Sequence, residues 1–169
     1  LGARQEQFLK MWGEDWKGTD FKVVLSQTIF SYATHISQGN RLLADLDSNG
    51  WPQSGRRRAV DLMRRCFAFH ISGDQHLGCV AQYGVDDWRD SSVAFCVPSI
   101  VNYYGRWWWP EEKPRHGQLH PELPFSGRFQ DGFGNKIAMH AYANPTQDNY
   151  MAAGYGLVRF KKSTRQITM

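Results

Sequence analysis

An aspartate and a histidine stand two positions apart, directly after an apolar run. The run at residues 67–72 has the composition of a β-strand, and Gly73 separates it from Asp74 and His76. If the backbone stays extended past Gly73, both side chains point the same way, and a carboxylate oxygen and an imidazole nitrogen converge. Ligands often bind at the carboxyl ends of strands, so the pair favours a metal site. The alternative is a turn in which Asp74 stabilises the backbone and His76 bonds a carbonyl group.

The segments around this pair predict an α/β arrangement. Helical spacing of apolar residues predicts helices over residues 4–16 and 56–66, the second capped by Ser54. Apolar runs predict strands over residues 21–25 and 67–72, and the helix between them favours a parallel pair. Because the runs are apolar throughout, they imply cover on both faces. We therefore expect them to pair with a larger sheet outside these residues.

The rest of the chain predicts short strands and two irregular stretches. Residues 28–50 lose their periodicity and form a candidate wall of a site, because long irregular connections are often functional. Residues 103–134 are rich in proline and carry three successive tryptophans at 107–109. They predict one long surface excursion whose tryptophans pack onto the domain. The remaining strands are predicted at residues 80–83, 93–97, 135–143, 154–160 and 166–169.

The composition indicates one globular domain. The chain has 169 residues, of which 41% are hydrophobic and 21% charged, enough apolar content for a core. Its net charge of +4 and the arginines at 56–58, 64 and 65 suggest an anionic partner. Most of these arginines fall on the solvated face of the predicted helix, and we recognise no nucleic-acid-binding motif, so we expect no nucleic-acid partner. We also expect no membrane span, because no apolar stretch of the sequence is long enough.

Three cysteines, Cys66, Cys79 and Cys96, lie in apolar surroundings. Their odd number and wide spacing fit neither a disulfide framework nor a zinc cluster. We predict that all three are small core residues.

Five segments occur in a recognisable order. They are Leu1-Gly2 with Phe8-Leu9, Phe21-Lys22-Val23-Val24-Leu25, Asn49-Gly50-Trp51-Pro52 with the arginines at 56–58, Ser72-Gly73-Asp74-Gln75-His76, and Gly154-Tyr155-Gly156-Leu157-Val158. Together they resemble the carboxyl-terminal half of alkaline phosphatase D-like enzymes, a branch of the calcineurin-like metallophosphatases. Asn49 and Trp51 stand where that family more often has aspartate and tyrosine, so no ligand role is carried onto either.

The resemblance implies that residues 1–169 are the carboxyl-terminal part of one metallophosphatase domain, an α/β fold with part of a β-sandwich flanked by helices. It implies hydrolysis of a phosphate monoester or diester by a metal-bound hydroxide, with Asp74 and His76 as catalytic metal ligands. Two metal ions are implied, drawn from iron, calcium, zinc or manganese. The expected partners are the phosphate ester substrate and the amino-terminal half of the same domain. The family also implies a periplasmic or extracellular location, although the chain opens on Leu1 without a signal-peptide pattern.

Other polar residues are weaker candidates. His35 could reach a site wall, although a loop histidine is more often solvated. Arg89 and Arg106 could bind phosphate oxygens, although a surface salt bridge is the default for both. His70 lies inside an apolar strand, where a core histidine bonded to a neighbour is expected.

Two further classes of protein stay open. One is a metallophosphatase-like chain without catalysis, which would use the excursion around Trp107 as a contact surface. The other is a carbohydrate-binding module, which rests only on the tryptophans. Upstream sequence with an aspartate-rich cluster and a glycine-aspartate-asparagine motif would favour the enzyme.

Overall fold

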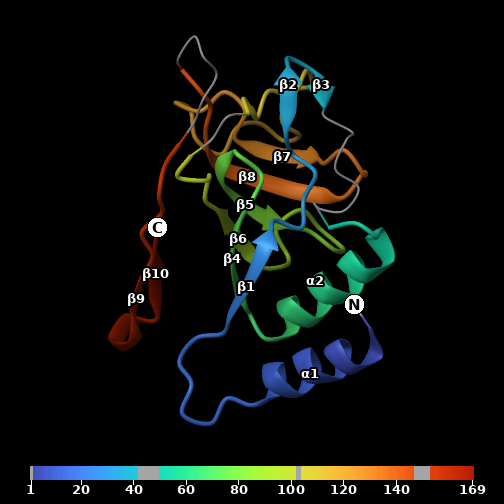
Figure 1. Ribbon diagram of the computed structural model, residues 1–169, viewed down its shortest axis with the longest axis vertical. Helices are drawn as coiled ribbons and strands as arrows, with labels where there is room; N and C mark the ends of the chain where they lie inside the picture. Colours follow the sequence, from blue (N-terminus) through green and yellow to red (C-terminus); the bar gives the residue numbers. More distant parts are fainter. Residues whose placement is uncertain (1, 42–49, 102–103, 147–152) are drawn as a thin grey trace.

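The computed structural model describes residues 2–41, 50–101, 104–146 and 153–169, which form a mixed α/β fold (Figure 1). Its helices are α1 (Ala3–Glu14), α2 (Gln53–Arg65) and the short 3₁₀ helix η1 (Lys162–Thr164). Its strands are β1 (Val23–Thr28), β2 (His35–Ser37), β3 (Asn40–Arg41), β4 (Phe69–Gly73), β5 (Gly78–Tyr83), β6 (Val93–Cys96), β7 (Gly127–Gln130), β8 (Lys136–Ala143), β9 (Arg159–Lys161) and β10 (Gln166–Thr168). The predicted wall at residues 28–50 lies partly outside the described residues.

Six of these strands form one mixed sheet in the order β1-β4-β6-β5-β8-β7. Strands β1, β4 and β6 are parallel to one another, and β5, β7 and β8 add antiparallel pairs. Helix α2 connects β1 to β4, so the predicted parallel pair is confirmed. The parallel strands end at Thr28, Gly73 and Cys96, and these ends meet at one edge of the sheet.

Helix α2 covers one face of the sheet and packs against α1 (Figure 1). It buries Val60 and Met63, as the helical spacing predicted, and also Ala59. Arg56 is buried too, unlike the solvated position expected for most of the arginines. It begins earlier than expected, at Gln53 after Pro52, so the prediction that Ser54 caps it is wrong. The fixed φ of proline suits a helix entry, and the side chain of Gln53 bonds the carbonyl of Gly50 at 3.1 Å.

The predicted strand at 67–72 begins two residues late because Phe67 ends helix α2. Phe67 has φ 51, and the amide of Ala68 donates to the carbonyl of Met63 at 3.1 Å. This hydrogen bond and a left-handed residue just past the helix form a Schellman ending. The ring of Phe67 is 86% exposed as a result.

The prediction of one long excursion at residues 103–134 is wrong at its end. Residues 127–130 form β7, an edge strand of the main sheet. The tryptophans before it divide between core and surface, because Trp108 is fully buried while Trp109 is 37% exposed. The indole nitrogen of Trp108 donates to the carbonyl of Phe125 at 2.7 Å, and its ring meets the ring of Phe129 edge-on.

The carboxyl-terminal segment differs most from the prediction. Only residues 159 and 160 of the predicted strand at 154–160 lie in a strand. This strand, β9, extends to Lys161 and pairs with β10. Gly156 lies so close to β6 that an added Cβ would be 2.7 Å from side-chain atoms of Phe95 and Val97. This close passage favours glycine and leaves residues 153–158 outside the main sheet.

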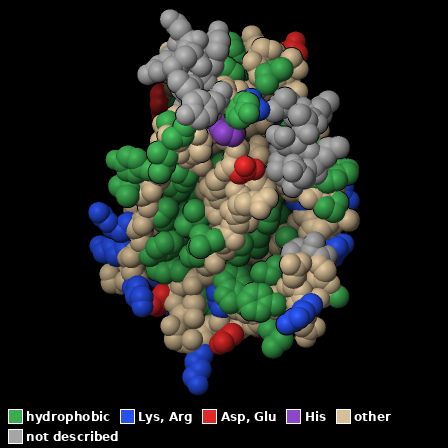
Figure 2. All heavy atoms as spheres, in the orientation of Figure 1, with side chains coloured by type: hydrophobic (Ala, Val, Ile, Leu, Met, Phe, Trp, Pro, Cys, Tyr) green, Lys and Arg blue, Asp and Glu red, His purple; other side chains and the backbone are tan. Residues whose placement is uncertain are grey.

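One face of the main sheet is buried, and the other is partly open. Burial alternates along β5 and β6, which places one side of each strand in the core. On the open face Leu25 is 74% exposed, and Val80, Phe95 and Ala141 line a groove of about 350 Å³. Figure 2 shows hydrophobic side chains gathered on the surface. Cover by a larger sheet, and with it the β-sandwich, stays a prediction.

Replacing Trp108 with Ala should lower the free energy of unfolding by about 3–5 kcal/mol, because it removes a fully buried aromatic side chain. Trp109→Ala is the matched control, since that ring is partly exposed and should cost less than half as much. Urea unfolding followed by circular dichroism measures both. Equal losses would contradict the division between core and surface.

Candidate functional site

Asp74 and His76 lie in the short turn between β4 and β5, at the edge where the parallel strands end. Asp74 has φ 68 and His76 has φ 54, so the prediction of an extended backbone past Gly73 is wrong. The amide of Gln75 donates to the carbonyl of Gly73 at 2.8 Å, which makes Asp74 the central residue of a tight, strained γ-turn. Non-glycine residues in such conformations cluster at functional sites.

The turn is anchored to the first strand. Gln75 is buried, and its side-chain amide donates to the hydroxyl of Thr28 at 3.1 Å. Thr28 ends β1, so this contact ties the turn to a strand more than forty residues earlier in the sequence. Asp74 itself is exposed at the surface. Sequence reasoning missed Gln75, because its role depends on a partner far away in the chain.

The ring of His76 lies beside the hydroxyl of Ser99. Its Nδ1 lies 3.5 Å from the hydroxyl of Ser99, at the outer limit of a hydrogen bond. That hydroxyl donates to the carbonyl of Val101 at 2.9 Å, so its oxygen is left to accept from the ring. A metal-bound histidine uses the same arrangement, with a second group bonded to its other nitrogen.

Arg106 is brought to the neighbourhood of His76. The ring of His76 meets the ring of Tyr104 edge-on, with the centroids 5.3 Å apart. The guanidinium carbon of Arg106 lies 5.4 Å from the centroid of the same tyrosine. Tyr104 therefore links the predicted ligand to a predicted phosphate-binding cation, and no sequence motif marks this tyrosine.

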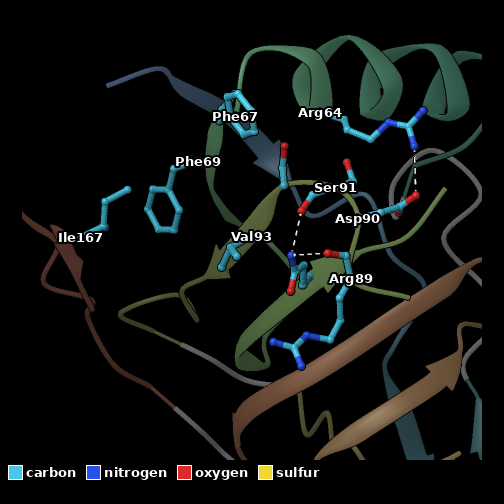
Figure 3. Close-up of a pocket in the computed structure, with 11 residues that line it drawn as sticks. Arg64, Phe67, Phe69, Arg89, Asp90, Ser91, Val93 and Ile167 are labelled. Atoms are coloured by element: carbon cyan, nitrogen blue, oxygen red, sulfur yellow. Dashed lines mark hydrogen bonds and ion pairs between the residues drawn. The ribbon is translucent and has the colours of Figure 1, made fainter. Parts of the chain in front are cut away.

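Arg89 lies at the opposite end of β5, in the connection to β6. It lines a pocket of about 360 Å³ together with Phe67, Phe69 and Ile167 (Figure 3). Its side chain extends away from the two phenylalanines in that view. The structure therefore does not bring Arg89 to Asp74 and His76.

His35 is a buried core residue and not a solvated loop residue. It is 1% exposed, its Nδ1 accepts a hydrogen bond from the amide of Trp109 at 3.3 Å, and its ring meets Trp108 edge-on. Burial lowers the pKa of His35 to about 4, with Arg41 adding to the effect. The side chain of His35 packs β2 against residues 107–109.

His70 lies below the turn in a buried chain of hydrogen bonds. The amide of Phe30 donates to the hydroxyl of Tyr83 at 2.9 Å, and that oxygen lies 2.8 Å from Nδ1 of His70. Nε2 of His70 lies 2.7 Å from the hydroxyl of Ser26, which donates to the carbonyl of Thr28 at 2.6 Å. The prediction of a core histidine bonded to its neighbours is confirmed.

The direction of this chain follows from its two ends. The carbonyl of Thr28 can only accept, so Ser26 gives its proton to it and accepts from Nε2–H of His70. Nδ1 of His70 then accepts from Tyr83, whose oxygen accepts from Phe30. Every link is satisfied when the ring is neutral. Burial accordingly lowers the pKa of His70 to about 4.

The turn contains two side chains of types that ligate metals in proteins, Asp74 and His76. The described residues contain no group of three or more His, Cys, Asp or Glu side chains arranged to hold a metal ion. Asp74 and His76 together offer one hard oxygen donor and one nitrogen donor. No helix in the described parts of the chain is long and apolar enough to cross a membrane.

Comparisons with known proteins add little to this geometry. No family model matches the chain, and no curated protein matches it. Among solved structures, one titled "Structure of PhoD" matches with a TM-score of 0.42 and 19% identity, over 59% of this chain. The chain spans 20% of that structure's length. An overlap this small carries no argument, so the function proposed below rests on the residues of this chain.

The free energy of unfolding should decrease as the pH is lowered, because His70 stays neutral in the folded protein. The unfolded chain takes up a proton near the ordinary pKa of 6.5, whereas folded His70 does so only near 4. Below pH 6.5 the unfolded state therefore binds more protons, and His70 should remove about 2 kcal/mol of stability between pH 6.5 and 5. Urea unfolding at both pH values measures the loss.

The matched variant is His70→Gln, which cannot titrate but keeps polar atoms in the same place. Its stability at pH 6.5 should be lower than that of the wild type, and its loss on going to pH 5 should be smaller. The same pH-dependent loss in both proteins would show that His70 is not responsible.

Proposed function

We propose that this chain carries part of the active site of a metal-dependent phosphoesterase, with Asp74 and His76 as metal ligands. The observation that carries the proposal is the strained turn, which holds both residues at positive φ where three parallel strands end. The resemblance of this segment to alkaline phosphatase D-like enzymes gives the reaction class.

The donor set of the turn fits a metal ion in part. A carboxylate and an imidazole suit iron, zinc or manganese, and calcium fits an oxygen-rich position next to them. Two metal ions, when bound, would neutralise the charge of a phosphate ester and make a water molecule more acidic. Because the turn offers only two donors, the other ligands would come from the amino-terminal half of the same domain, which we propose as the partner of this chain.

The residues around the turn have distinct tasks in this proposal. Ser99 would orient the ring of His76 through its contact with Nδ1. Gln75 fixes the backbone of the turn to β1. Arg106 would bind phosphate oxygens, for which its planar guanidinium is suited. The proposed substrate is a phosphate monoester or diester. From the family resemblance we also propose a periplasmic or extracellular location.

The second candidate is a metallophosphatase-like chain without catalysis that serves as a binding module. The apolar groove beside Val80 and Phe95 favours it, since an open apolar surface of this kind often contacts another molecule. Metal content discriminates the two functions, because the binding module needs no metal ion in the turn.

Replacing His76 with Ala or Asp74 with Asn in the complete protein should remove bound metal and lower phosphoesterase activity by several orders of magnitude. His76→Ala removes a donor nitrogen, and Asp74→Asn removes the charge and basicity of the carboxylate. Neither side chain is in the core, so both variants should fold. Metal analysis and hydrolysis of a chromogenic phosphate monoester and diester measure the effect.

His116→Ala is the matched control for these variants. His116 is an exposed histidine with φ 62, close to the φ of 54 at His76. Replacing it therefore removes a histidine from a similar backbone conformation at a position outside the turn. This variant should keep its metal and its activity. Normal metal content and activity in His76→Ala would show that Asp74 and His76 form only a turn.

Residues 1–169 by themselves should not hydrolyse phosphate esters. A two-metal site needs more ligands than Asp74 and His76 to hold both ions in place. Hydrolysis by the purified 169-residue chain that depends on His76 would contradict the proposed need for an amino-terminal half.

A further inference from the structure

Two buried cysteines face each other below the turn. Cys79 in β5 and Cys96 in β6 are directly opposite partners of an antiparallel pair. They are 4% and 0% exposed, and both are buried positions of their strands, so their side chains lie on the same face of the sheet. Opposite residues of antiparallel strands have Cα atoms about 4.5 or 5.5 Å apart, and both distances suit a disulfide.

The third cysteine has a different environment. Cys66 is also buried, but its thiol donates to the carbonyls of Leu62 and Met63, the preceding residues of helix α2. The sequence prediction treated all three cysteines alike, as small core residues. The sheet register separates them, because it joins Cys79 to Cys96 and leaves Cys66 on another element.

The pair also contacts the turn. The thiol of Cys96 donates to the carbonyl of Gly73 at 3.5 Å, and the same carbonyl accepts the amide of Gln75. This carbonyl is therefore the acceptor that holds the γ-turn around Asp74. A change in the sulfur of Cys96 alters the bonding of the turn directly.

We propose that Cys79 and Cys96 form a reversible disulfide, and that this bond changes the local stability of the turn at residues 73–77. The proposal concerns a modification site and stands whether or not the chain is a phosphoesterase. It applies where a peroxide is present, since a small oxidant is needed at a buried site.

The chemistry balances with hydrogen peroxide as the oxidant. A thiolate of the pair attacks one peroxide oxygen, the O–O bond breaks, and the other oxygen leaves as water. The sulfenic acid so formed is attacked by the second thiolate, the S–S bond forms, and its oxygen leaves as a second water. Two thiols are oxidised and one peroxide is reduced. A thiol reductant reverses the bond by exchange.

The bond has a clear structural consequence for the turn. Once Cys96 is oxidised it has no S–H to donate. Of the two donors to the carbonyl of Gly73, the thiol of Cys96 and the amide of Gln75, only the amide then remains. Opening of the turn should then change, and amide hydrogen exchange reports such local opening.

The test treats the complete reduced protein with hydrogen peroxide, alkylates the thiols after denaturation and maps the peptides by mass spectrometry. We expect a linked peptide pair containing Cys79 and Cys96, lighter by two hydrogen atoms, and Cys66 still alkylated. Reduction should restore alkylation of all three cysteines. Full alkylation of Cys79 and Cys96 after treatment, or only oxygen adducts on them, would overturn the proposal.

Variants sharpen the assignment. Cys66→Ala is the matched control and should still form the linked pair, whereas Cys79→Ala and Cys96→Ala should not. Peptide mapping of the wild type tests the proposal without any variant. It therefore still applies if one of the variants fails to fold. Hydrogen exchange of residues 73–77 should differ between the reduced and the oxidised wild type, and identical exchange would overturn the coupling to the turn.

Discussion

The buried hydrogen-bond chain through His70 is the interaction on which the strand arrangement depends. It runs from the amide of Phe30 through Tyr83, His70 and Ser26 to the carbonyl of Thr28. These groups join β5, β4 and β1 inside an apolar core, where an unpaired polar group costs about 1–3 kcal/mol. The neutral imidazole satisfies one donor and one acceptor at once, so the sequence needs a histidine there and needs it uncharged.

The candidate site is a consequence of this arrangement. With β1 and β4 held parallel, Thr28 and Gly73 end at the same edge, and Gln75 reaches across to Thr28. The chain must turn at once into β5, and the tight turn gives Asp74 its positive φ. The strained residue, Asp74, is exposed at the surface, and the hydrogen bond from Gln75 to Thr28 stabilises the turn in this conformation.

Much of the fold follows from local patterns. Apolar periodicity predicts α2, the strands around it and their parallel pairing, because burial along one helix face and along short apolar runs is a local property. The pattern misplaces Phe67, since the ending of a helix depends on backbone conformation more than on hydrophobicity. It also overestimates the strand at 154–160, where the segment crosses the open face of the main sheet without joining it.

The sequence by itself determined the residue types and their order: an aspartate and a histidine after a strand, three cysteines, and histidines within or near apolar runs. The tertiary structure decided which of these groups meet. It buried His35 and His70 while leaving His76 half-buried, and it placed Cys79 opposite Cys96. The physical reason is that the protonation and bonding of a side chain depend on its neighbours in space. The partners of His70, which are Ser26 and Tyr83, come from other strands that no local pattern connects to it.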